Sequence, residues 1–291
     1  MKRILPFLCV LLFANAIYAQ DACEKLGWQL AVHAYTFKNF SIFECIDKTA
    51  ALGFKYMSLS GSVNLDGKKS VKTVDLSDAD LQRILDHAKE KGLKLVNIGV
   101  VQLPNNEAES RKVFEFAKKA GIDTLVAEPP DDALDLVEKL CKEYKIKVAI
   151  HDHPKPSHYW NPDTVLAAVK GRTPLMGACA DTGHWLRSGL DPVECLKKLE
   201  GRVIVLHFKD LVPSETNGEA KTPKKKSESR DMHDVPWGTG VGNVKAQMAE
   251  LKRQNFHGAF CVEYEYHWEN SMPEIAECLK WFKATAAELA K

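Results

Sequence analysis

The chain has 291 residues, of which 45% are hydrophobic and 27% charged, and its formal net charge is +1. This length and composition fit one large globular domain or two small ones. A charge so close to zero gives no general attraction to nucleic acids or anionic membranes, so neither is expected as a partner.

The first 19 residues have the pattern of a secretory signal peptide. Two basic residues are followed by the apolar run 4–13 and by small residues, with cleavage expected after Ala19 or, as the alternative, after Ala16. The apolar run is far shorter than the roughly 20 residues that span a bilayer, which disfavours a membrane anchor. We therefore expect an exported protein, periplasmic if its source is a Gram-negative bacterium, with residues 20–291 as the folded domain.

Apolar segments that resemble strands alternate with amphipathic helical segments along the rest of the chain. The expected strands are 28–33, 54–60, 93–100, 122–128, 147–151, 176–181, 202–210 and 258–266. The expected helices are 42–52, 78–92, 107–120, 133–145, 162–169, 191–201, 243–256 and 272–289. Ser77 and Asp191 are expected as N-caps. This alternation is typical of βα units around a parallel sheet.

Eight such units without a second apolar block or a linker predict an α/β fold, a single-domain (β/α)8 TIM barrel, which typically needs about 250 residues. An open doubly wound sheet is the alternative, but it usually carries a Gly-rich phosphate loop after its first strand, and the residues that follow 28–33 do not form one. The charged, low-complexity segment at about 213–234 is expected to be a long loop, either a lid or a solvated insertion.

Titratable side chains stand at the ends of most of the expected strands. They are His33, Glu128, His151 with His153, Asp181 with His184, His207 with Lys209, and Glu263 with Glu265. A parallel barrel gathers its strand ends at one face, where the active site lies. Carboxylates with one or two imidazoles can hold a divalent cation. Oxygen-rich ligands favour Mn²⁺ or Mg²⁺, while the imidazoles leave Zn²⁺ and Co²⁺ open.

The ordered motifs HDH, DTGH, HFKD, PWGTGVGN and VEYE resemble those of the xylose-isomerase-like sugar phosphate isomerase/epimerase superfamily, whose members are TIM barrels. The resemblance covers nearly the whole mature chain. It implies a single divalent cation held by Asp181 of DTGH, His207 of HFKD and Glu263 of VEYE. It further implies that His184 contacts substrate or supports a ligand, and that Lys209 contacts a substrate oxygen.

The fifth strand departs from this pattern. Sugar epimerases of the superfamily place a glutamate there, whereas this chain has His151. Members that resemble inosose dehydratase also carry a histidine run at this strand end, so the sequence is more similar to that branch. We expect Glu128, at the end of the fourth strand, to supply the missing carboxylate ligand.

These residues predict an enzyme that acts on an unphosphorylated sugar or keto-sugar through an enediolate. Glu263 or His151 would remove a proton next to a carbonyl, and His184 or His153 would deliver one. Delivery to carbon gives isomerisation or epimerisation. Delivery to a departing oxygen gives dehydration or elimination, on a keto-sugar, cyclitol or keto-glycoside. An exported sugar-binding barrel without catalysis is the third alternative.

Further side chains are expected to contact the substrate, a small-molecule sugar. His33 and Lys209 would bind its oxygens, although Lys209 and Asp210 could instead form a surface ion pair. Trp185 and Trp237 would stack on sugar faces, with packing of loops as the alternative. A homo-oligomer is left open.

Overall fold

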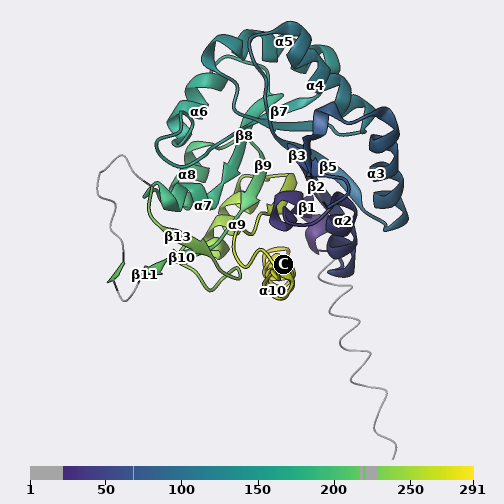
Figure 1. Cartoon of the computed structure of the whole chain (residues 1–291). Helices are drawn as coiled ribbons and strands as arrows, with labels where there is room; N and C mark the ends of the chain where they lie inside the picture. Colours follow the sequence, from purple (N-terminus) through teal and green to yellow (C-terminus); the bar gives the residue numbers. More distant parts are fainter. Residues whose placement is uncertain (1–21, 68, 217–218, 221–228) are drawn as a thin grey trace, which may run out of the picture.

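The computed structural model describes residues 22–67, 69–216, 219–220 and 229–291 (Figure 1). The expected signal peptide therefore lies outside the described residues, as do 217–218 and 221–228 of the charged segment. Within the described ranges, no helix combines the length and apolar character that crossing a bilayer requires.

Eight parallel strands close into one barrel, with helices around it (Figure 1). The strands are β1 (Trp28–His33), β2 (Tyr56–Ser60), β5 (Lys94–Val101), β6 (Thr124–Ala127), β7 (Lys147–His151), β8 (Met176–Asp181), β9 (Val203–Phe208) and β14 (Gly258–Val262). Their order around the barrel is β1-β14-β9-β8-β7-β6-β5-β2. The predicted (β/α)8 fold is confirmed.

The helices agree closely with the expected ranges. They are α2 (Ile42–Ala51), α3 (Asp78–Glu90), α4 (Glu107–Lys119), α5 (Leu134–Tyr144), α6 (Pro162–Val169), α7 (Thr182–Arg187), α8 (Pro192–Lys198), α9 (Val244–Arg253) and α10 (Met272–Leu289). Short 3₁₀ helices are η1 (Ala34–Phe37), η2 (Thr73–Asp75) and η3 (Asp131–Ala133). Among the nine α-helices named above, only α7 was not predicted, because it begins directly at the end of β8 with no intervening loop.

The helix starts follow from side-chain capping. The Ser77 side chain accepts the N–H of Asp80 at the start of α3, and the Asp191 side chain accepts two N–H groups of α8. At α2, Ser41 and Glu44 form a complete capping box. Both predicted N-caps are confirmed, since each satisfies backbone donors that the first helical turn leaves without partners.

Two apolar layers fill the molecule. Outside the barrel, aromatic rings pack between strands and helices, as in the contact of Phe260 with Phe282 at 4.9 Å between ring centroids. Inside the barrel the buried side chains are mostly small: Ala31, Val96, Val126, Ala149, Cys179, Val205, Ala259 and Cys261. Small residues fill the narrow interior, and polar groups gather above them at the C-terminal ends of the strands.

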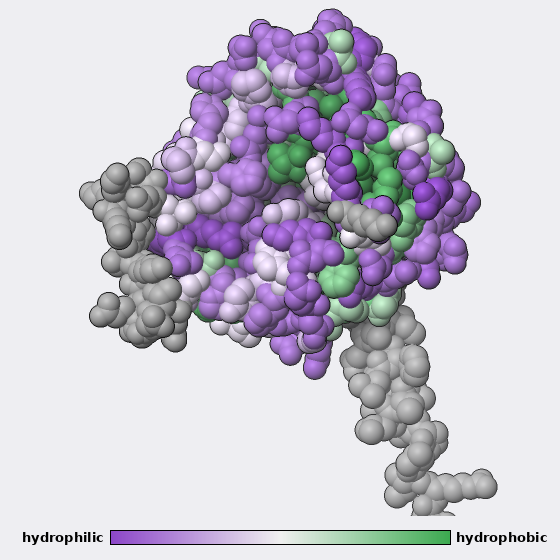
Figure 2. All heavy atoms as spheres, in the orientation of Figure 1, coloured by the Kyte–Doolittle hydropathy of each residue, from purple (hydrophilic) through white to green (hydrophobic). Residues whose placement is uncertain are grey.

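Short antiparallel pairs extend the connections that leave these strand ends. β3 (Ser62–Asn64) pairs with β4 (Ser70–Lys72) after β2, and β10 (Leu211–Pro213) pairs with β13 (Met232–Asp234) after β9. β11 (Glu215–Thr216) pairs with β12 (Glu219–Ala220) farther out in the charged segment. The outer surface is mainly hydrophilic in this orientation, with hydrophobic residues showing near α3 (Figure 2).

Candidate metal centre and active site

Four titratable side chains meet at the C-terminal end of four neighbouring strands. His151 ends β7, Asp181 ends β8, His207 lies near the end of β9, and Glu263 follows β14. All four are buried, and one ligand atom from each lies within 4.8 Å of the others. His207 Nδ1 lies 3.1 Å from Glu263 Oε2, and His151 Nε2 lies 3.8 Å from Asp181 Oδ2.

The cluster has the donors and the unsatisfied atoms that a cation site needs. Neither His151 Nε2 nor His207 Nε2 has a hydrogen-bond partner among the described residues, although both atoms are buried. Buried polar atoms without partners are rare and require an explanation such as an ion. Two carboxylates with two imidazoles suit Zn²⁺, Mn²⁺ or Co²⁺. The residues therefore fit a divalent cation, with His151 on β7 as the fourth donor.

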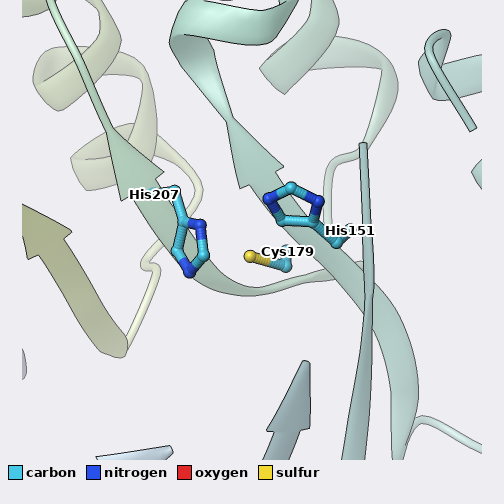
Figure 3. A group of neighbouring side chains, drawn as sticks. All are labelled: His151, Cys179 and His207. Carbon is cyan, nitrogen blue, oxygen red and sulfur yellow. The ribbon is translucent and has the colours of Figure 1, made fainter. Parts of the chain in front are cut away.

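Cys179 lies beneath the cluster and can also approach its histidines. Its sulfur points between the rings of His151 and His207 (Figure 3). Burial raises the pKa of the Cys179 thiol well above its ordinary value. Cys179 forms a three-donor group with His151 and His207, whereas Asp181 and Glu263 join the same two histidines in a four-donor group. The four-donor group offers the larger ligand set and is the candidate cation site, with Cys179 beneath it.

Lys209 is buried within the acidic side of the cluster. Its ammonium lies 3.0 Å from Asp181 Oδ2 and 2.8 Å from Oε2 of both Glu263 and Glu265. Burial alone would lower the pKa of Lys209, but these carboxylates raise it well above its ordinary value. The surface-pair alternative is wrong, because Lys209 and Asp210 are only 0% and 1% exposed.

Glu128 lies behind His151 and not with Asp181, His207 and Glu263. Its Oε1 is 3.2 Å from His151 Nδ1 and also contacts His153 Nδ1, so the three form a second group that shares His151. Burial opposes ionisation of Glu128, but the two imidazoles lower its pKa to about 2. The place in the main cluster expected for Glu128 is taken by His151, which Glu128 orients as carboxylates commonly orient metal-binding histidines.

His33 is held as a neutral ring at the edge of the cluster. Its Nδ1 accepts the N–H of Tyr35 at 3.2 Å, so its Nε2 carries the proton and donates to the carbonyl of Gly99 at 3.0 Å. Burial lowers the pKa of His33 to about 4. Glu263 Oε1, 3.5 Å from His33 Nδ1, therefore has no ion pair with this ring.

The turn from β8 into α7 positions His184. Asp181 Oδ1 accepts the N–H of His184 at 2.8 Å as the helix N-cap, which brings His184 Nε2 to 3.4 Å from Asp181 Oδ2. Burial keeps the pKa of His184 well below its ordinary value, so the ring is neutral. Its centroid lies 5.6 Å from that of His151 and 5.3 Å from that of His153, which places three imidazoles side by side.

Three supporting residues escaped the sequence analysis. Arg187 bonds Glu265 at 2.9 Å and lies 3.5 Å from Asp234. Asp152 accepts the backbone N–H of Asp181 at 2.7 Å. The sequence feature that could have identified Arg187 was its position three residues after His184, one turn farther along α7. For Asp152 the signal was its central position in the HDH motif. Asp234, the last residue of the charged segment, offered no signal.

The stacking role expected of two tryptophans does not fit their positions. Trp185 and Trp237 are 1% and 2% exposed and belong to the apolar core. Trp237 packs on Phe208 and Phe282, with ring centroids 4.9 and 5.7 Å away. Because neither ring offers a free face, the alternative of internal packing holds for both.

A cavity of about 320 Å³ opens above the cluster. Its lining includes the three grouped imidazoles together with His33 and Glu263. A small polar molecule in this cavity would thus meet a carboxylate, the neutral rings of His33 and His184, and the candidate cation site at once. This volume is at the lower end of the range for small-molecule sites, about 300–1,000 Å³.

Comparisons with known proteins agree with this architecture. A model of the family described as xylose isomerase-like TIM barrel matches residues 46–285. An uncharacterised protein of Parabacteroides distasonis has a similar solved structure, with 35% identity, 89% of this chain and 99% of that chain covered, and a TM-score of 0.67. No curated protein matches the chain.

Two more distant solved structures share the fold. A D-tagatose 3-epimerase-like protein is 16% identical over 89% of this chain and 98% of its own, with a TM-score of 0.65. The probable 3-DHS dehydratase AsbF of Bacillus anthracis is 14% identical over 87% of this chain and 97% of its own, with a TM-score of 0.64. At such identities the similarity establishes the architecture alone.

Proposed function

Since the chain belongs to the family of xylose isomerase-like TIM barrels, we propose that it is a divalent-metal-dependent enzyme that isomerises or epimerises an unphosphorylated sugar or keto-sugar. The observation that carries the proposal is the convergence of His151, Asp181, His207 and Glu263 within 4.8 Å beneath an open cavity. Two carboxylates and two imidazoles at the C-terminal face of a barrel are suited to bind a cation and, through it, sugar oxygens.

A divalent cation in this cluster would supply a Lewis acid that stabilises negative charge on a substrate oxygen. Glu263 is the proposed base. Lys209 and His207 both approach its Oε2, which leaves Oε1, beside the neutral His33, to take a proton from the substrate carbon. The proton leaves a carbon next to a carbonyl, so an enediolate forms.

Of the imidazoles on the other side of the cavity, His153 is the proposed proton donor, because the ring of His184 is neutral and is assigned to substrate contact. His184 and His153 both line the cavity, and His153 is the more accessible, with 48% of its side chain exposed. Return of the proton to carbon completes an isomerisation or epimerisation. Before the substrate proton is taken, Lys209 keeps Asp181 and Glu263 ionised, because its ammonium contacts both.

A dehydratase or lyase acting on a keto-sugar, cyclitol or keto-glycoside is the second candidate. The grouping of His151, His153 and His184 supports it, since elimination needs a donor that protonates the departing oxygen. Candidate keto-sugars incubated with the enzyme in D₂O separate the two reactions. Deuterium at carbon without loss of water or an alcohol supports isomerisation, whereas release of either supports elimination.

Metal analysis tests both enzymatic candidates against a non-catalytic sugar-binding barrel. We expect divalent metal to co-purify or bind, a chelator to abolish isotope exchange, and added metal to restore it. Asp181→Asn should lose metal and turnover, while the matched surface change Asp163→Asn should retain both, because Asp163 is exposed and pairs with Lys198. Absence of bound metal from the wild-type protein, with full turnover in Asp181→Asn, would refute the proposal.

We also propose that the chain is exported, on the pattern of its first residues. N-terminal sequencing of the secreted protein should begin at Gln20, or at Ile17 if cleavage follows Ala16. A mature protein that retains Met1 would contradict export through this segment.

A further inference from the structure

A second cavity adjoins the one above the metal cluster. It encloses about 300 Å³, and both cavities are lined by Tyr35, Ser60 and Ser62. Tyr35 lies in η1 directly after β1, Ser60 ends β2, and Ser62 begins the β3–β4 hairpin. Because three residues border both spaces, the two cavities lie next to each other at the C-terminal face of the barrel.

The second cavity offers both aromatic rings and neutral polar groups. Tyr35 and Phe40, both partly buried, are its aromatic residues. The ring of Trp268 supports Tyr35 edge-on at 5.7 Å between centroids. The hairpin contributes Asn64 and Ser70. Aromatic faces can pack on the C–H faces of a sugar ring, while hydroxyl and amide groups bond its hydroxyls.

The one charged residue lining this cavity, among those described, is Lys38, and its ammonium is already engaged. Lys38 Nζ lies 3.5 Å from the ring centroid of Trp268 and 4.9 Å from that of Tyr35. Such cation–π contacts fix the ammonium at the rim. Because no carboxylate is among the described residues that line it, the cavity suits an uncharged ligand.

A third cavity beside the mouth has a different character. It shares Gly61, Ser62 and Val100 with the cavity above the metal cluster. The rest of its lining includes Glu109 and the ion pair of Asp75 with Lys112. Charged side chains that pair in solvent present little to a neutral ring. The second cavity is therefore the better extension of the site.

We propose that the substrate is a keto-glycoside: its reacting ring, which carries the carbonyl, occupies the cavity above the metal cluster, and a second sugar ring, linked through the glycosidic oxygen, occupies the cavity bounded by Tyr35, Phe40 and Asn64. The assignment of the reacting ring rests on the proposed function. Each cavity alone is near the lower limit of small-molecule sites, and together they accommodate two rings.

Calorimetric titration of the full-length mature protein, loaded with Mn²⁺ or Zn²⁺, tests this directly. The probes are pairs that share one ring: methyl β-glucoside with cellobiose, methyl α-glucoside with maltose, and methyl β-galactoside with lactose. We expect the disaccharide of at least one pair to bind about tenfold more tightly or better. Ser70→Trp should remove that advantage by filling the second cavity. The control Lys72→Trp, in the same hairpin but lining the third cavity, should retain it.

Equal affinities within every pair, or an advantage that Ser70→Trp leaves intact, overturns the proposal. Isotope exchange in D₂O separates this failure from that of the proposed function. Metal-dependent exchange into a monosaccharide, with no preference for disaccharides, refutes the second-ring site and leaves the proposed reaction standing. A disaccharide preference without metal binding or exchange supports the second-ring site and refutes the proposed reaction.

Discussion

Replacement of Lys209 by methionine tests the charge balance on which the candidate site depends. The Lys209 ammonium is buried between Asp181, Glu263 and Glu265, at 2.8 to 3.0 Å from one oxygen of each. Methionine keeps most of the unbranched stem, so the main change is the loss of the positive charge. The variant therefore isolates electrostatics from packing.

The size of the expected destabilisation follows from the burial of both the Lys209 ammonium and the carboxylates that it contacts. Removal of one partner from a buried ion pair typically costs about 3–5 kcal/mol, because the remaining charge is left uncompensated. Arg187 still contacts Glu265, so the loss concerns mainly Asp181 and Glu263. At about 2–4 °C per kcal/mol for a domain of this size, the metal-free variant should melt roughly 6–20 °C below the wild type.

Thermal and urea unfolding followed by circular dichroism, with a chelator and then with Zn²⁺ or Mn²⁺, measure the melting temperature and the free energy of unfolding. Metal should stabilise the variant more than the wild type, since a cation in the cluster replaces the lost charge. Lys139→Met is the control: the Lys139 side chain is 56% exposed and pairs with Glu107, so the substitution should cost less than about 1 kcal/mol. A metal-free Lys209→Met within about 1 kcal/mol of the wild type would show that the ammonium does not compensate the carboxylates.

Three further substitutions address the surroundings of the site. Glu128→Ala should weaken zinc binding by about 10- to 100-fold, because Glu128 orients His151. Competition with a chromophoric chelator measures the zinc affinity, and an unchanged affinity would show that Glu128 does not support metal binding. Asp210→Ala should destabilise the protein by about 3 kcal/mol, because the Asp210 carboxylate accepts three backbone N–H groups of the loop 236–243. Amide hydrogen exchange in that loop should become faster, and an unaltered exchange rate would contradict the anchoring role of Asp210. Burial raises the pKa of Asp234 to about 7 from an ordinary 3.8, so the folded state loses stability as pH rises from about 4 to 7. Asp234→Asn should reduce this pH-dependent loss of stability and exceed the wild type by at least about 1 kcal/mol in free energy of unfolding at pH 8. Urea unfolding at pH 5 and 8 measures it, and an equal change in stability of both proteins between these pH values would refute the prediction.

Local sequence determined the elements of this fold. Alternating apolar segments predicted β1 and β7 with their observed bounds, since each strand is buried nearly throughout. N-cap side chains located the starts of α3 and α8 because capping depends on residues within one turn. The gathering of Asp181, His207 and Glu263 was also foreseeable, since closure of a parallel barrel brings strand ends together.

Only the tertiary structure decided which way the side chains at those ends point. Glu128 and His151 are 23 positions apart, and the packing of β6 against β7 turns the imidazole toward the cluster and leaves the carboxylate behind it. The burial of Lys209 among three acids, and of both tryptophans away from substrate, likewise depends on neighbours from distant segments. The sequence by itself determined which chemical groups reach the mouth of the barrel, because that follows from strand periodicity. Their roles as ligand, support or packing were decided by contacts that exist only once the barrel has closed.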